Sequence, residues 1–149
     1  YPNATLCIVG YGSYENELRK MIKNFNLSNN VIFFRFQSDP YPFYCKSKIF
    51  VMASETEGLP CALMEAMSCE LLCISSSVGN IEDVLKDGIN GLTFSSGNIS
   101  KLKELMILAL ENYDDLIEVR ANARKLIVNE YSYKVATDKW NKIISGMLQ

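Results

Sequence analysis

Two glutamates eight positions apart are the residues of this sequence best suited to chemistry. Glu57 and Glu65 bracket a Gly-Leu-Pro turn and the start of an apolar, helix-patterned stretch. Pro60 suits the first position of that helix, because its missing N–H costs nothing there and its φ is already helical. The pattern therefore predicts Glu57 in the loop before a helix and Glu65 about one and a half turns inside it.

The backbone between these glutamates predicts an anion-binding site. The N–H groups of Gly58, Leu59, Cys61 and Ala62 would form the positive end of the helix, and such an end binds phosphate readily. With a carboxylate on either side, the site suits a ligand that has a phosphate centre and hydroxyl-rich ends, such as a nucleotide sugar. The alternative is ordinary: a glutamate before a helix favours the dipole, and one within a helix is usually solvated.

Short runs of apolar residues alternate with stretches of helical periodicity along the whole chain, which is typical of a parallel α/β sheet. The expected strands cover residues 5–9, 31–34, 49–53, 71–75 and 92–94. The expected helices cover residues 14–25, 39–45, 60–68, 81–85, 101–110, 115–129 and a last helix capped by Ser132 and running to 144. We expect an α/β fold: a Rossmann-like, doubly wound parallel sheet with helices on both faces and a C-terminal helical segment. Residues 1–149 would form one domain.

Helical spacing also predicts which apolar side chains are buried. The expected core positions of helix 60–68 are Ala62, Leu63, Ala66 and Met67. Those of helix 101–110 are Leu102, Leu105, Met106 and Ala109. Trp140 is expected to pack as well.

Composition excludes several classes of protein. A net charge of −2 without a basic stripe argues against nucleic-acid binding. The five cysteines are odd in number and lie mostly in apolar runs, which indicates reduced thiols and a cytoplasmic location. With no histidine and no second cysteine pair, no metal site is expected. No apolar run is long enough to span a membrane, and the start at Tyr1 rather than Met predicts a piece of a longer protein.

Several glycines at predicted strand ends leave two interpretations open. Gly10 and Gly12 follow the first strand, but Glu15 interrupts the G-x-G-x-x-G dinucleotide pattern, so a tight turn needing φ > 0 is the simpler interpretation. Gly79 follows the strand at 71–75, where it either permits close backbone approach or makes a simple turn.

Phe36 also lies at a strand end, after the second strand, and would either flank a nucleotide base or be merely exposed. Turn chemistry explains the Asp-Gly and Asn-Gly pairs at 87–88 and 90–91.

The segments EGLPCALMEAMSC and CISSSVGNIEDVLKDGINGLTF resemble the C-terminal half of family 4 glycosyltransferases, which have the GT-B fold. The resemblance runs from about Leu6 to Phe94 and continues weakly to the C-terminus. It implies a retaining, metal-independent transfer of a hexose from a UDP- or GDP-sugar, in the synthesis of a surface polysaccharide. It makes Glu57 the catalytic residue facing the donor sugar and Glu65 the residue that holds the ribose hydroxyls. The donor-binding residues it implies besides Glu65 are Gly58, Leu59, Pro60, Gly10, Gly12, Arg35, Phe36 and Gly79.

By the same resemblance, the intact protein would carry an N-terminal acceptor domain, located in the cytoplasm or at the inner membrane surface. That domain, together with the first strand of the present one and its arginine and lysine, would be missing here. We therefore expect this piece to bind nucleotide weakly, not to turn over, and to self-associate to some extent.

The sequence also departs from the family. Glu70, Leu72 and Glu82 stand where glycine, proline and proline are customary, Asp83 replaces a glutamate, and Arg35 replaces a glycine. Arg35 would add positive charge near the base or phosphate. The departures keep open a catalytically inert binding module of GT-B type. A nucleotide-sugar epimerase of the same architecture is the other alternative, against which the intact glutamate pair argues.

Overall fold

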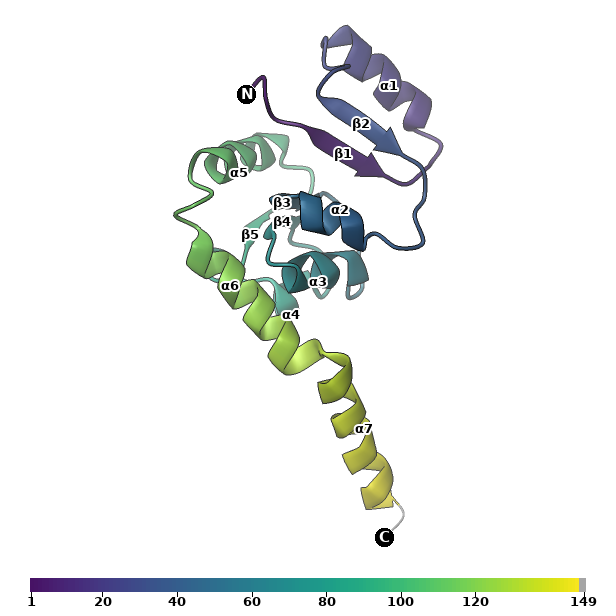
Figure 1. The fold of residues 1–149 in the computed structure, drawn as a ribbon, viewed down its shortest axis with the longest axis vertical. Helices are drawn as coiled ribbons and strands as arrows, with labels where there is room; N and C mark the ends of the chain where they lie inside the picture. Colours follow the sequence, from purple (N-terminus) through teal and green to yellow (C-terminus); the bar gives the residue numbers. More distant parts are fainter. Residues whose placement is uncertain (148–149) are drawn as a thin grey trace. The chain divides into compact units, whose positions relative to one another are not determined.

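The computed structural model describes residues 1–147 and divides the chain into two compact units. The first unit, Tyr1–Pro40, contains strand β1 (Leu6–Val9), helix α1 (Glu15–Asn24) and strand β2 (Val31–Phe34). Its two strands are parallel, and α1 connects them as a crossover helix (Figure 1). This order is the βαβ unit predicted from the alternation of apolar bursts and helical patterns.

Helix α1 is attached to one face of its sheet by both apolar and charged side chains. Ile8 and Phe33 are opposite each other in the strand register, and both line a hollow together with Leu18 of the helix. Arg19 holds its guanidinium 4.4 Å from the centre of the Phe33 ring, and it also pairs with the Glu15 carboxylate at 2.8 Å. The helix therefore covers the Ile8 face of the sheet.

The second unit starts at Tyr41 and contains a three-stranded parallel sheet in the order β3-β4-β5. The strands are β3 (Ile49–Met52), β4 (Leu72–Ser76) and β5 (Leu92–Phe94). The helices are α2 (Tyr41–Lys46), α3 (Cys61–Ser68), α4 (Ile81–Val84), α5 (Ile99–Glu111), α6 (Ile117–Leu126), the π-helical turn η1 (Ile127–Tyr131) and α7 (Tyr133–Met147). Within residues 1–147, no helix combines the length and the apolar character that crossing a membrane requires.

Side chains of the central strand β4 alternate between two apolar clusters, one on each face of this sheet. Cys73 joins Leu63 and Met67 of α3, and α4 and α6 contribute to the same cluster. Leu72 and Ile74 belong to the other cluster, which α5 covers. Helices thus lie on both faces, with α5 on one side and α3 on the other (Figure 1), as the sequence predicted. All five residues of β4 are buried, the apolar Leu72–Ile74 as well as the two serines that end the strand.

Apart from shifts at the ends of helices and strands, the structure differs from the sequence prediction at α3, at Trp140 and after residue 126. Pro60 is the N-cap residue of α3 with extended ψ, not its first helical residue, and Ala62 is exposed rather than buried. Trp140 is 63% exposed on α7, a helix without a buried residue over positions 133–147. The helix expected over 115–129 is interrupted by η1. The cap at Ser132 is confirmed, since its hydroxyl accepts from the Val135 N–H at 3.4 Å.

Candidate functional site

Glu57 is held in the loop between β3 and α3 by a chain of two serine hydroxyls. Ser54 Oγ donates to Glu57 Oε1 at 2.7 Å, and Ser76 Oγ donates to the Ser54 carbonyl at 2.7 Å. Ser76 is fully buried at the end of β4, and Glu57 is partly buried. The carboxyl end of the central strand therefore fixes the loop that carries the first carboxylate, at the edge where open α/β sheets bind ligands.

Gly79 also holds this loop, because only a residue without a side chain fits there. Its φ is +54°, and a Cβ atom at this position would lie 1.8 Å from the Glu57 carbonyl oxygen. Gly79 is therefore a turn residue and also permits a close backbone approach, that of Glu57, while its contact with a ligand stays a prediction. The turn after β4 and the loop after β3 touch at this point.

The predicted anion-binding groups are open in the structure. Gly58, Leu59, Cys61 and Ala62 are all exposed, and within residues 1–147 their N–H groups donate to no acceptor. No side chain caps α3, so the positive end of the helix is uncovered by the described residues. The exposure of Ala62 is part of the same feature, since a buried Ala62 would have closed this end of the helix.

Glu65 lies inside α3, as predicted, on the exposed side of the helix, and a buried tyrosine holds its carboxylate. The Tyr44 hydroxyl donates to Glu65 Oε2 at 3.0 Å. Tyr44 is only 9% exposed, and burial, followed by the bond to Glu65, raises the pKa of its hydroxyl. The hydroxyl therefore remains a proton donor to the carboxylate over the whole physiological pH range.

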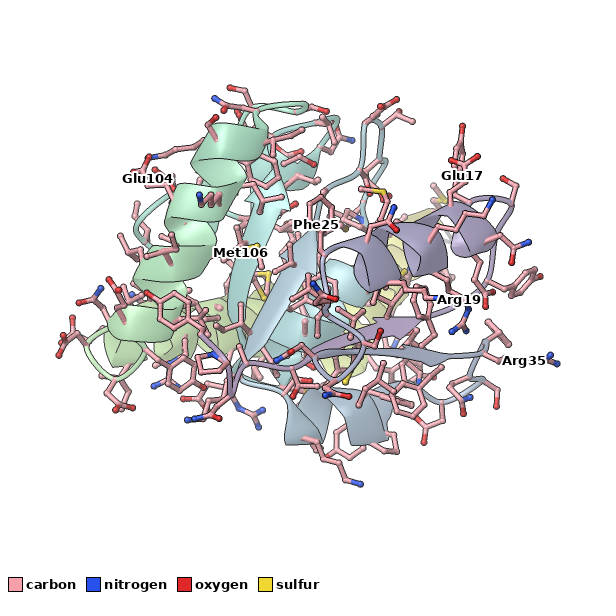
Figure 2. The ribbon with its side chains drawn as sticks, turned by 90° about the horizontal axis from the view of Figure 1, so that it is seen from above. Glu17, Arg19, Phe25, Arg35, Glu104 and Met106 are labelled. Carbon is pink, nitrogen blue, oxygen red and sulfur yellow. The ribbon has the colours of Figure 1, made fainter. Side chains whose placement is uncertain are left out.

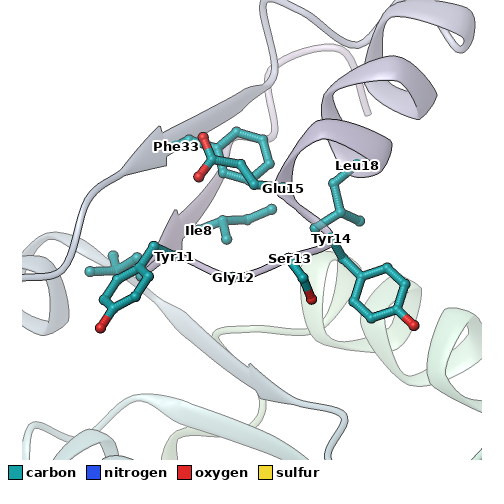
Figure 3. A pocket seen from close by; sticks show the side chains of 10 residues that line it. Ile8, Tyr11, Gly12, Ser13, Tyr14, Glu15, Leu18 and Phe33 are labelled. Carbon is teal, nitrogen blue, oxygen red and sulfur yellow. The ribbon is translucent and has the colours of Figure 1, made fainter.

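In the first unit, the glycines after β1 border a hollow of about 320 Å³ (Figure 3). Gly10 has a φ of +141° and donates its N–H to the Phe34 carbonyl at 2.9 Å, so the tight-turn interpretation is confirmed for this residue. Ile8, Phe33, Glu15 and Leu18 surround the hollow, and the rings of Tyr11 and Tyr14 lie at its rim. Gly12 lines the hollow as well, without a positive φ.

Arg35 and Phe36 directly follow β2 and are exposed. The Arg35 side chain extends away from the ribbon into open space (Figure 2), and the Phe36 ring is 67% exposed. Within residues 1–147 no hydrogen bond or ion pair holds either side chain, and their assignment to a nucleotide base or phosphate stays a prediction.

The Asp-Gly and Asn-Gly pairs have the structural role that their turn chemistry predicted. Asn90 is buried, accepts from the Lys86 N–H at 2.6 Å and donates to the Val84 carbonyl at 2.9 Å. Asp87 accepts from the Thr93 N–H at 2.8 Å, and Gly88 has a φ of +69°. Together they connect α4 to β5.

Ser54→Ala is expected to lower the free energy of unfolding by about 1–3 kcal/mol, because the partly buried Glu57 carboxylate loses its only hydroxyl donor within the described residues. The backbone carbonyl of residue 54, which accepts from the Ser76 hydroxyl, is unchanged in this variant, so the bond to Glu57 is the one that is lost. Urea unfolding measures the change. Ser95→Ala, at an exposed loop position, is the matched control and should shift stability by no more than about 0.5 kcal/mol. Equal stabilities of the two variants would contradict the anchoring of Glu57.

Sequence reasoning missed the side chains that hold the two carboxylates. Ser54 and Ser76 were seen only as parts of a loop and of a polar strand end, and Tyr44 as part of a short helix. For the tyrosine the sequence offers only the general rule that a tyrosine hydroxyl finds a partner when it is buried. Sequence spacing cannot name that partner, because Tyr44 and Glu65 lie on different helices.

A parallel sheet with helices on both faces and open amides at the start of α3 define an α/β protein of Rossmann-like architecture. The profile of the family described as glycosyl transferases group 1 matches residues 1–126, and the chain belongs to this family. An uncharacterized glycosyltransferase of Methanocaldococcus jannaschii is 43% identical over 76 residues, which are 51% of this chain and 19% of that protein.

Two further comparisons cover nearly the whole chain. The poly(ribitol-phosphate) alpha-N-acetylglucosaminyltransferase of Staphylococcus aureus is 30% identical over 141 residues, 93% of this chain and 28% of that protein. The crystal structure of HepE from Anabaena in complex with UDP superimposes with a TM-score of 0.89 at 19% identity, over 98% of this chain and 42% of that one. The chain therefore spans less than half of the length of these relatives. The family and the fold predicted from the sequence are confirmed.

Proposed function

We propose that this chain is the donor-binding part of a retaining glycosyltransferase that moves a hexose from a nucleotide sugar onto a surface polysaccharide. The observation that carries the proposal is the row of four exposed backbone N–H groups at the start of α3, which have no acceptor within residues 1–147. Anchored carboxylates precede and follow this row. Relatives named for glycosyl transfer and a structural neighbour in complex with UDP support the choice of ligand.

In this proposal each group of the site has one task. The amides of Gly58 and Leu59 and the start of α3 hold the diphosphate, and Glu65 accepts hydrogen bonds from the ribose hydroxyls. Glu57 faces the donor sugar as the catalytic residue. A departing nucleoside diphosphate gains negative charge, and fixed donors that stabilise this charge lower the barrier. Transfer would not need a metal ion, and the donor would be a UDP- or GDP-sugar.

Glu65→Ala is expected to weaken the binding of UDP and GDP by about 1.5–3 kcal/mol, the usual value of hydrogen bonds to a charged group. Calorimetric titration of UDP, GDP and the corresponding nucleotide sugars into wild type and into Glu65→Ala measures the loss of affinity. Glu118→Ala removes another exposed glutamate, from α6, and should leave the affinity unchanged. Equal affinities of wild type and Glu65→Ala would remove Glu65 from the site. Failure of the wild-type protein to bind any of these nucleotides would overturn the proposed function as a whole.

A further inference from the structure

We propose that Tyr44 is a positioning residue, whose hydroxyl fixes the Glu65 carboxylate in the orientation that receives the ribose hydroxyls of the donor. This inference rests on the proposed function. It adds a residue from outside the loop and helix that carry the glutamate pair, since Tyr44 belongs to α2.

The tyrosine ring is held rigidly by its surroundings. It belongs to the apolar cluster that contains Leu63 and Met67, and its ring stands edge-on to Phe50 with 6.1 Å between centroids and 65° between planes. A ring that is 9% exposed and packed in this way has little rotational freedom. Its hydroxyl is therefore a fixed donor, in contrast to a donor on a surface side chain.

Glu65 needs such a donor because it lies on the solvent-exposed side of α3. A free glutamate there would exchange between rotamers and lose that freedom on binding. The Tyr44 bond occupies Oε2, while Oε1 accepts no hydrogen bond from residues 1–147. One oxygen thus anchors the carboxylate and the other remains available, and a pair of neighbouring ribose hydroxyls can donate to the lone pairs that remain.

The expected cost of losing this anchor follows from the freedom that Glu65 regains. Immobilising one rotamer-rich side chain on binding corresponds to a loss of about 2- to 10-fold in affinity. Tyr44→Phe removes the hydroxyl and keeps the ring against Phe50, so it is the smallest change that tests the role. We expect this variant to bind UDP about 2- to 10-fold more weakly than wild type.

Two further measurements separate positioning from a structural effect of the substitution. In the Glu65→Ala background, Tyr44→Phe should cause no additional loss, because the carboxylate it orients is gone. For 2′,3′-dideoxy-UDP, which lacks the ribose hydroxyls, wild type and Tyr44→Phe should bind equally. Tyr41→Phe, which removes the hydroxyl of a 61% exposed tyrosine from the same helix, should leave UDP binding unchanged.

The outcomes distinguish this inference from the proposed function. A loss of UDP affinity in Glu65→Ala together with unchanged affinity in Tyr44→Phe would overturn the positioning role alone. An additional loss on adding Tyr44→Phe to Glu65→Ala, or an equal loss for UDP and its dideoxy analogue, would assign Tyr44 to general packing and also overturn it. Unchanged UDP binding in Glu65→Ala would overturn the proposed function and the inference with it.

Discussion

Gly79→Ala is expected to lower the free energy of unfolding by about 2–4 kcal/mol and to displace the loop that carries Glu57. Two separate costs add. A non-glycine residue at a φ of +54° pays for the left-handed conformation. The new Cβ would also lie 1.8 Å from the Glu57 carbonyl oxygen, and this neighbour is backbone, so the loop has to move.

Gly88→Ala separates these two costs. Gly88 has a φ of +69°, nearly the same conformation, but a Cβ there meets no atom within 4 Å. This control should therefore lose only about 1–2 kcal/mol, the conformational cost by itself. The difference between the two variants reports the contact of Gly79 with the Glu57 backbone.

Urea unfolding and UDP titration of both variants measure the effect on stability and on the site. Gly79→Ala should bind UDP more weakly than wild type, because the Glu57 carbonyl lies directly before the amides of the proposed anion site. Gly88→Ala should keep the wild-type affinity. Equal stability and equal UDP affinity of the two variants would contradict a requirement for glycine that comes from the contact between residue 79 and the Glu57 backbone.

The contact of Gly79 also shows which part of the site the sequence can predict. Turn residues announce a special backbone conformation, and the left-handed φ of Gly79 is of this kind. What the turn touches depends on the register of β3 and β4, which pairs Met52 with Ser75 and brings the two following loops together. The sequence therefore predicted the need for glycine but not the Glu57 backbone as its neighbour.

The order and approximate bounds of the helices and strands were predictable because each element has a strong local pattern of apolar residues. Strands β2 and β5 have the predicted bounds, β1 and β3 differ by one residue at one end, and β4 and α1 differ by one residue at each end. The predictions failed where tertiary packing decides. Trp140 has helical spacing with other apolar residues, but α7 has no buried residue among its described positions. The π-helical turn at Ile127–Tyr131 continues the alternation of apolar and charged residues of α6, so no sequence pattern distinguishes it from an α-helix.

The two glutamates were placed correctly because a helix start fixes both positions. Once α3 begins at Cys61, Glu57 must lie in the loop and Glu65 in the second turn. Glu65 is held by Tyr44 of α2, 21 residues away in sequence. Glu57 is held by Ser54 of its own loop, and the Ser54 carbonyl in turn accepts from Ser76 of β4, 22 residues away. Such long-range pairs follow from how the elements pack, which residue types alone do not specify.

The anchoring of α3 predicts the second large effect. Leu63→Ala is expected to lower the free energy of unfolding by about 2–5 kcal/mol, the range measured for truncating a buried leucine. Leu63 is fully buried in the cluster between α3 and the sheet, so its loss leaves a cavity that this cluster has to fill. Leu110→Ala removes a 40% exposed leucine from α5 and is the matched control, with an expected change of no more than about 1 kcal/mol.

The same variant tests whether stability and binding are carried by different sides of α3. Leu63, Ala66 and Met67 face the core, whereas Glu65 is exposed. Because Ala66 and Met67 still hold the helix, UDP affinity measured well below the unfolding midpoint should stay at the wild-type value. A loss of affinity in proportion to the loss of stability would show that the site depends on the complete packing of α3. In that case Glu65→Ala would have to be compared with wild type at equal stability before its effect is assigned to the carboxylate.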